Sequence, residues 1–132
     1  MRAVITGPTG AIGIALIKKC IEENTEVYAI CRKNSTRISR IPRNHLVHIV
    51  QCDLSELRDL DRTQIESCDI FYHLGWDATI GDGRNDMPLQ IKNIRYTIDA
   101  VDLAHRLSCK VFVGTGSQAE HGRFEGKLSA SV

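Results

Sequence analysis

The sequence predicts an α/β fold built on a doubly wound parallel sheet of about five strands. Two observations predict this class: short β-branched runs alternate with segments of helical period, and the connections between them are short. Strand–helix–strand units are right-handed, so we expect helices on both faces of the sheet and the strand order 3-2-1-4-5. No repeat, linker or low-complexity tract interrupts the 132 residues, which indicates a single domain.

The first half of the chain supplies three of the strands. Residues 3–6 form a β-branched run that is typical of a strand buried on both faces. A helix begins at Ala11 and ends near Asn24, and strands are expected over residues 26–31 and 46–50. The apolar face predicted for this helix consists of Ile12, Ala15, Leu16 and Cys20.

The second half predicts one long helix and two further strands. Ser55 is the predicted N-cap of a short helix. The strongest helical period places Ile91, Ile94, Ile98, Val101 and Ala104 at steps of three and four. The expected elements are a short helix (55–60), a strand (69–74), a polar loop (75–87), a helix (91–107) and a strand (110–115).

Charge and cysteine usage exclude several classes of partner. Seventeen basic and sixteen acidic residues leave a net charge of +1, so we expect no binding of nucleic acid. No apolar run approaches the ~20 residues of a membrane span, and we expect no membrane partner. The cysteine count is odd and no C-x-x-C pair occurs, which predicts neither disulfides nor a metal site. Free thiols indicate a reducing compartment, and we expect the cytoplasm.

Three glycines lie at a spacing of three where the first strand turns into the first helix. In the run Thr6-Gly-Pro-Thr-Gly-Ala-Ile-Gly13, one glycine allows the tight turn and a second lets the backbone approach a pyrophosphate. Gly13 lets the helix pack against the sheet, and the amides of the helix N-terminus face the phosphates. The alternative is a strand–helix turn that merely favours glycine. The context predicts a Rossmann-type dinucleotide site.

The end of the second strand bears on which dinucleotide binds. NAD enzymes usually place a carboxylate there to bind the ribose 2′-hydroxyl. This chain has Cys31 at that place, followed by Arg32 and Lys33. A guanidinium favours a 2′-phosphate, so NADP is predicted in preference to NAD. The alternative is that Arg32 is a solvated surface charge.

The spacing G-x-x-G-x-x-G resembles that of the extended short-chain dehydrogenase/reductase family, the NAD(P)-dependent epimerases and dehydratases of nucleotide sugars. Four further segments resemble the family at suitable intervals. They are Cys52-Asp53-Leu54, His73-Leu74-Gly75, the run from Asn93 to Thr97, and the run from Phe112 to Gly122. The resemblance implies hydride transfer to and from the nicotinamide, with a nucleotide sugar as the substrate.

The glycine motif and the resemblance together imply individual site residues. Ser117 takes the position of the catalytic hydroxyl, although it is also a residue type that forms turns after strands. His73 and His121 are interpreted as structural residues and not as proton carriers. The predicted cofactor contacts are Gly7, Thr9, Gly10, Ala11, Ile12, Gly13, Arg32, Asp53, Leu54, Leu74, Gly75, Asn93 and Thr115.

The family's reaction also requires a Tyr-x-x-x-Lys pair, which the 132 residues lack. Tyr28, Tyr72 and Tyr96 are followed four residues later by Arg, Trp and Ala. The resemblance places the motif beyond Val132, so we expect residues 1–132 to be the cofactor-binding portion, without the substrate domain and inactive alone. Two alternatives stay open: a catalytically inactive dinucleotide-binding or sensing module, and an enzyme completed by another chain.

Association of copies is the last expectation. If no sixth strand follows, the strand at 110–115 has a free edge, which invites pairing with another chain. The apolar face of the helix at 91–107 would then be only partly covered by the sheet, leaving an apolar patch. Its members are Ile91, Ile94, Ile98 and Val101. The family resemblance implies dimerisation through the same helix. A homo-oligomer is therefore predicted, unless the residues after Gly116 cover the patch.

Overall fold

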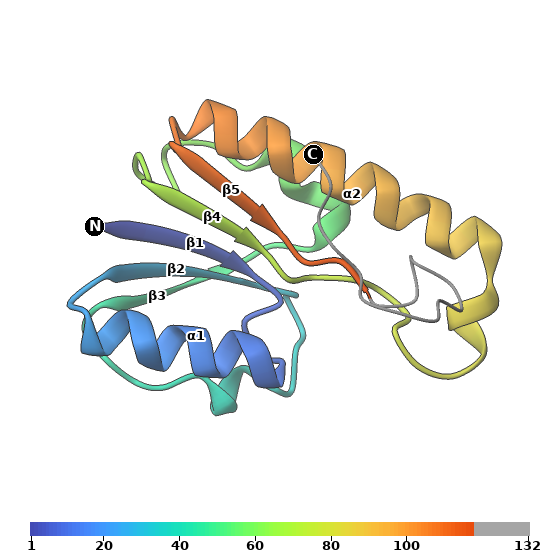
Figure 1. The fold of residues 1–132 in the computed structure, drawn as a ribbon, viewed down its shortest axis with the longest axis horizontal. Coiled ribbons are helices and arrows are strands. Elements are labelled where there is room, and N and C mark those ends of the chain that lie inside the picture. Colours follow the sequence, from blue (N-terminus) through green and yellow to red (C-terminus); the bar gives the residue numbers. More distant parts are fainter. Residues whose placement is uncertain (118–132) are drawn as a thin grey trace, which may run out of the picture.

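A computed structural model describes residues 1–117 and contains one five-stranded parallel sheet (Figure 1). The strand order is β3-β2-β1-β4-β5, which confirms the predicted order. Each of the five strands begins and ends within one residue of its predicted limits. The strands are β1 (Arg2–Thr6), β2 (Glu26–Cys31), β3 (Val47–Gln51), β4 (Ile70–His73) and β5 (Val111–Gly114).

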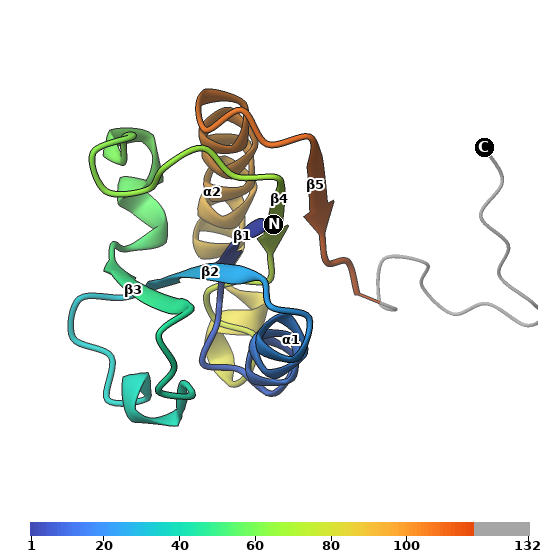
Figure 2. The ribbon, with the colours of Figure 1, turned by 90° about the vertical axis from the view of Figure 1, so that its left-hand side faces the viewer.

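Helices cover both faces of the sheet, as predicted (Figures 1 and 2). Helix α1 (Ala11–Glu22) packs on one face, and helix α2 (Met87–Arg106) lies on the other with the 3₁₀ helix η2 (Leu54–Asp59). Two shorter 3₁₀ helices, η1 (Ile38–Arg40) and η3 (Asp82–Asn85), lie in the connections. No helix within residues 1–117 is long and apolar enough to cross a membrane.

Each face of the sheet has its own apolar core. On the α2 face, Phe71 is fully buried and its ring stacks on that of Phe112 with centroids 5.5 Å apart. On the α1 face, Ile5 and Ile17 are fully buried. Strand β1 contributes to both cores because its successive side chains point to opposite faces. Strand β1 lies at the centre of the sheet, which agrees with the prediction that its β-branched run is buried on both faces.

The buried face of α1 differs from the predicted one. Gly13, Ile17 and Cys20 face the sheet, whereas Ile12 is 67% exposed and Ala15 is also exposed. The cause is the close contact at Gly13, where an added Cβ would lie 2.5 Å from the carbonyl oxygen of Gly7. This contact fixes the rotation of the helix, and the residues four and seven positions later follow it into the core.

Two helix starts also differ from the expectation. Asp53, and not Ser55, is the N-cap of η2, and its backbone N–H donates to Glu56 Oε2 at 3.4 Å. Helix α2 begins at Met87, four residues before the predicted start, because the Asp86 side chain caps it by accepting from Leu89 N–H at 3.1 Å. Pro88 is accommodated because the first turn of a helix needs no N–H from it.

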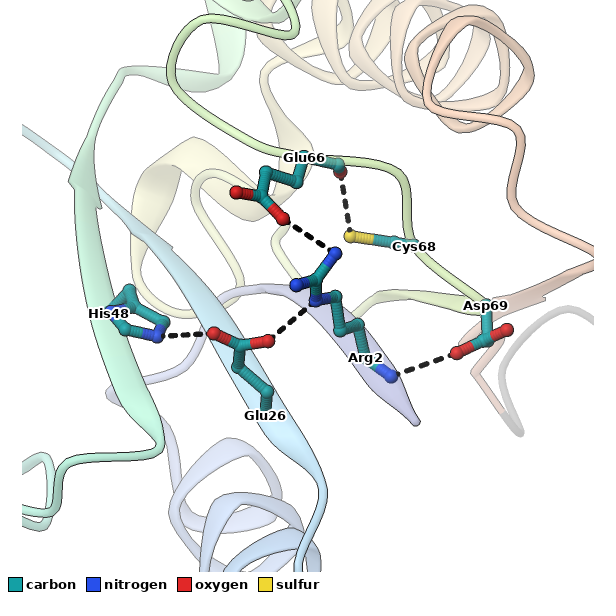
Figure 3. Close-up of polar contacts among 6 residues, drawn as sticks. All are labelled: Arg2, Glu26, His48, Glu66, Cys68 and Asp69. Atoms are coloured by element: carbon teal, nitrogen blue, oxygen red, sulfur yellow. Dashed lines mark hydrogen bonds and ion pairs between the residues drawn. The ribbon is translucent and has the colours of Figure 1, made fainter.

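A polar chain crosses the amino ends of the strands, opposite the carboxyl edge (Figure 3). Arg2 Nε donates to Glu26 Oε2 at 2.6 Å, and the other oxygen of Glu26 lies 2.8 Å from His48 Nε2. Arg2 Nη1 pairs with Glu66 at 2.6 Å, and the backbone N–H of Arg2 donates to Asp69 Oδ2 at 2.9 Å. Because these groups are satisfied by one another, we interpret this edge as structural.

Candidate functional site

A cavity of about 410 Å³ opens at the carboxyl edge of the sheet. In doubly wound sheets this edge is where ligands bind, since the strand order reverses there. Segments far apart in the sequence form its wall. They are the turn from Gly7 to Gly10, the end of β2 from Ile30 to Arg32 with Ser35 and Arg37, the exit of β3 at Cys52 and Leu54, and the run from Leu74 to Ile80.

The β1–α1 turn is shaped by its glycines. Gly7 has a φ of +67°, and an added Cβ would lie 2.8 Å from the backbone nitrogen of Gly75. Only glycine fits both the conformation and the close approach of the two loops. Gly10 is the N-cap of α1 and contributes no side chain, and the first turn of the helix contains no acidic residue. The positive end of the helix dipole is therefore open to an anion at this wall.

Thr6 and His73 connect the turn to the loop after β4. Thr6 Oγ1 accepts from the N–H groups of Leu74 and Gly75 at 3.2 and 3.1 Å. The hydroxyl proton is then directed to His73 Nδ1 at 2.9 Å, so the ring proton is on Nε2, facing Thr97 Oγ1 at 3.3 Å. Burial lowers the pKa of His73, and the neutral ring holds the two strands together. These contacts agree with the structural role expected for His73.

Positive charge lies at the β2 end of the cavity. Arg32 and Arg37 both line it, together with Ser35. Lys33 is directed elsewhere, since its Nζ pairs with Glu56 Oε1 at 2.8 Å. Cys31, where many dinucleotide sites carry a carboxylate, is buried, and burial raises the pKa of its thiol to about 11. A neutral thiol and two guanidinium groups make this end of the cavity suited to an anionic group.

The structure brings together seven of the thirteen predicted cofactor contacts. Those lining the cavity are Gly7, Thr9, Gly10, Arg32, Leu54, Leu74 and Gly75. Three others, Ala11, Ile12 and Gly13, lie on the first turn of α1 and do not line the cavity.

The remaining predicted contacts have other partners in the described residues. Asp53 Oδ1 accepts from Lys33 N–H at 3.4 Å. Asn93 is buried and is hydrogen-bonded to the backbone of Asp77, and Thr115 donates its backbone N–H to His73 O at 3.2 Å. The predicted catalytic Ser117 is exposed, three residues beyond β5, and is not part of the cavity wall. His121 lies outside the described residues.

Several residues of the cavity wall were not predicted. Ser35 and Arg37 belong to the polar and basic stretch of residues 32–45, and that composition was the only signal for them in the sequence. Trp76, Asp77, Ala78, Thr79 and Ile80 also line the cavity. They follow the predicted His73-Leu74-Gly75 segment directly. Their loop has no periodic pattern, so the sequence did not indicate that their side chains line the cavity.

No metal centre is seen in the part of the chain that the structure describes. Residues 1–117 contain no cluster of three or more His, Cys, Asp or Glu side chains that could hold a metal ion. All five cysteines are free thiols, and four of them are buried. Burial raises the pKa values of these thiols, which makes them poor nucleophiles and poor ligands.

The parallel sheet, its strand order and the glycine turn define a Rossmann-type domain, with a cavity at the carboxyl edge of the sheet. The chain belongs to the NAD dependent epimerase/dehydratase family, whose sequence model matches residues 3–131. This confirms the resemblance inferred from the sequence. A search of curated protein sequences found no match.

Solved structures that match this chain include epimerases that act on UDP-linked sugars. A UDP-galactose 4-epimerase matches 92% of this chain with a TM-score of 0.77 and 21% identity. The UDP-N-acetylglucosamine 4-epimerase of Methanobrevibacter ruminantium M1, in complex with UDP-N-acetylmuramic acid, matches 98% with a TM-score of 0.79 and 20% identity. The enzyme WbmG of Bordetella bronchiseptica, in complex with NAD, matches 86% with a TM-score of 0.66 and 17% identity. The chain spans 40%, 42% and 36% of these three proteins.

Proposed function

We propose that this chain is the NAD(P)-binding portion of an epimerase/dehydratase-type oxidoreductase that acts on a nucleotide sugar. The observation that carries the proposal is the Gly7–Gly10 turn, which forms one wall of the cavity and leaves no room for a side chain at Gly7. Family membership supports the reaction type. The complexes of the structural neighbours, one with NAD and one with a UDP-linked sugar, support the cofactor and substrate class.

The residues around the cavity fit a dinucleotide. The glycine turn and the uncapped first turn of α1 would hold the pyrophosphate. Arg32 would bind an anionic group on the adenosine ribose, and the carboxylate of Asp53 would contact the adenine, as the family resemblance implies. Leu54, the next residue, lines the cavity. The bound nicotinamide supplies the hydride acceptor and donor. The protein's own part is to bind and orient the dinucleotide.

NADP is proposed as the preferred cofactor. The support is the wall residues Arg32 and Arg37, together with a neutral Cys31 at the place where NAD enzymes carry a carboxylate. A 2′-phosphate adds negative charge, which a pair of guanidinium groups can neutralise by charge-assisted hydrogen bonds. NAD lacks this phosphate, so the two arginines would add no comparable hydrogen bonds to its binding.

Catalysis is proposed to need residues outside positions 1–132. Ser117 is the proposed hydroxyl that assists proton transfer, and the Tyr-x-x-x-Lys pair would come from a helix of the complete enzyme that follows residue 132. We expect the 132-residue chain to bind a dinucleotide without turning over a sugar. The test is a fusion to a homologous C-terminal half, which should restore epimerase or dehydratase turnover.

In that fusion, Ser117→Ala should lower the rate by about 10²-fold, the usual contribution of a positioned proton-transfer group. An unchanged rate would show that Ser117 is not catalytic. A fusion that binds the dinucleotide but never turns over, with several nucleotide sugars offered, would favour the inactive binding module instead.

Association into a homo-oligomer is also proposed, together with a reducing compartment such as the cytoplasm. Four apolar side chains on one stripe of α2 are between 46% and 58% exposed: Ile91, Ile94, Ile98 and Val101. Val111 and Val113 on the neighbouring strand β5 are exposed as well. Exposed apolar side chains gathered along one stripe of a helix are typical of an interface. The five free thiols support the reducing compartment.

A further inference from the structure

The loop between β4 and α2 forms one wall of the cavity without regular hydrogen bonding of its own. From Trp76 to Ile80 every residue lines the cavity, and the short helix η3 follows. Backbone carbonyls and amides in such a segment need partners from elsewhere. Two amide side chains on α2, Gln90 and Asn93, supply them. They lie three residues apart and therefore project from the same face of the helix.

Asn93 holds the loop at Asp77. Its Oδ1 accepts from the backbone N–H of Asp77 at 2.8 Å, and its Nδ2 donates to the backbone carbonyl of the same residue at 2.9 Å. The second Nδ2 hydrogen is directed to Gln90 Oε1 at 3.2 Å. Asn93 is 1% exposed, so its own side of each of these bonds is shielded from water. A reversed amide would face the Asp77 N–H with its own donor, which fixes the orientation.

Gln90 connects Asn93 to the rest of the loop. Its Oε1 accepts from the indole Nε1 of Trp76 at 2.9 Å, in addition to the bond from Asn93. Its Nε2 donates to the carbonyls of Gly83 and Ala78 at 2.9 and 3.4 Å. Both hydrogens and the oxygen of this amide are therefore used by the loop. The two side chains form one hydrogen-bonded unit, which we call the amide clamp (Gln90 and Asn93).

The loop is held in a conformation that it would not adopt by itself. Ala78 has a φ of +57°, in the left-handed region that is unfavourable for a residue with a Cβ. Gly83 packs directly on it, since an added Cβ at Gly83 would lie 2.8 Å from Ala78 Cβ. Backbone strain of this kind persists only where surrounding contacts determine the conformation. The amide clamp makes those contacts.

We propose that Gln90 and Asn93 are positioning residues that hold the 76–83 loop as a wall of the dinucleotide site, with Trp76 as the side chain they orient. The inference rests on the proposed function, because the ligand of the cavity is the dinucleotide proposed there. It adds a specific mechanism: α2 acts on the cofactor through the loop backbone, and Asn93 contributes by binding Asp77 and not by contacting the cofactor.

The test compares Gln90→Leu with Lys92→Ala in the full chain. Lys92 is exposed on the same helix and serves as the matched control. Two readouts are taken: NADP affinity by titration calorimetry, and amide hydrogen exchange in residues 76–83 relative to the strand β1. In Gln90→Leu we expect faster exchange in the loop, unchanged exchange in β1, and an NADP affinity lower by about tenfold because the site is no longer preorganised. Lys92→Ala should match the wild type in both.

A second pair of variants keeps the test decisive if Gln90→Leu does not fold. Gln90→Glu keeps the acceptor for Trp76 and loses both donors to the loop carbonyls, so it should also speed loop exchange. Trp76→Phe removes the indole N–H, keeps an aromatic ring, and should weaken NADP binding less than Gln90→Glu. Faster loop exchange with unchanged affinity would overturn the positioning role, and so would unchanged loop exchange.

Absence of NADP and NAD binding in the wild-type chain would instead contradict the proposed function. The exchange data would still decide whether the amide clamp holds the loop.

Discussion

Thr6 Oγ1 lies 2.9 Å from His73 Nδ1, where the central strands β1 and β4 end side by side at the cavity. Both side chains are buried. The same hydroxyl accepts the amides of Leu74 and Gly75, so one oxygen holds the start of the cavity loop and fixes the tautomer of the histidine. The geometry of the site therefore depends on a polar contact inside the sheet.

Thr6→Val should destabilise the protein. The substitution keeps the shape of the side chain and leaves the amide of Gly75 and His73 Nδ1 without their partner in a buried place. The amide of Leu74 keeps only its bond to the backbone carbonyl of Thr6 at 3.3 Å. The expected loss of unfolding free energy is about 1–3 kcal/mol, measured by urea denaturation. Thr36→Val, at an exposed position, is the control and should change the stability by less than about 0.5 kcal/mol. Equal effects of the two variants would contradict the role given to Thr6.

Stability should fall as the pH is lowered through the range in which histidine titrates. Burial lowers the pKa of His73, so the unfolded chain takes up a proton at higher pH than the folded one. The stabilisation is present above the unfolded pKa of about 6.5 and is lost as the pH falls from there toward the folded pKa. Urea denaturation at pH 7.5 and pH 5.5, about one unit on either side of that value, measures it. The loss should be smaller in His73→Gln, and an identical loss in both proteins would assign it to other groups.

Two glycines of the same turn should respond differently to alanine. At Gly13 an added Cβ would lie 2.5 Å from Gly7 O, whereas at Gly10 the nearest heavy atom is 3.6 Å away. Gly13→Ala should cost about 1–3 kcal/mol of stability by overpacking, and Gly10→Ala should cost little. Thermal unfolding of both variants checks this. A Gly10→Ala variant as unstable as Gly13→Ala would be inconsistent with the geometry of the turn.

Removing an apolar side chain from the exposed stripe of α2 should weaken self-association. Ile94 is 58% exposed, so Ile94→Lys leaves the core intact and places a charge in the proposed interface. Light scattering at micromolar concentration should show an oligomer for the wild type and a smaller species for Ile94→Lys. Asp102→Asn, on an exposed position of the same helix, is the control. A monomeric wild type would refute the association.

The fold was predictable because its signals are local. The β-branched run of β1 and the apolar period of α2 are properties of neighbouring residues, and the handedness of the crossovers determines the strand order. The rotation of α1 was not predictable in this way, because it depends on the contact of Gly13 with the backbone of Gly7, which only the folded turn creates. The spacing of the apolar residues therefore predicted that a helix forms here. It did not predict which side of that helix faces the sheet.

The candidate site was predictable where a strand end or a glycine marks it. Gly7 follows β1 and the pair Leu74 and Gly75 follows β4, while Gly10 begins α1. The topology brings these strand ends together. Arg37 and Trp76 lie in irregular segments, whose course is set by contacts such as that of Trp76 with Gln90. Asn93 was assigned to the cofactor by resemblance, whereas its hydrogen bonds in the structure are to Asp77 and Gln90.

Arg32 should determine the choice between the two dinucleotides. It lines the cavity beyond the end of β2, where the 2′-phosphate of NADP would lie. Arg32→Ala should lower the affinity for NADP by about tenfold or more, since a charge-assisted hydrogen bond is lost, and should leave that for NAD within about twofold. Arg40→Ala, in the same basic stretch but outside the cavity wall, is the control. Equal losses for NADP and NAD would remove the basis for the preference.

Binding of a dinucleotide in the cavity at the carboxyl edge of the sheet is the proposal on which the others depend. Titration calorimetry of the 132-residue chain with NADP and with NAD tests it. We expect saturable binding of both at one site per chain, with NADP the tighter ligand and with binding abolished in Gly7→Val. Absence of heat with either dinucleotide, from a chain shown to be folded by circular dichroism, would contradict it.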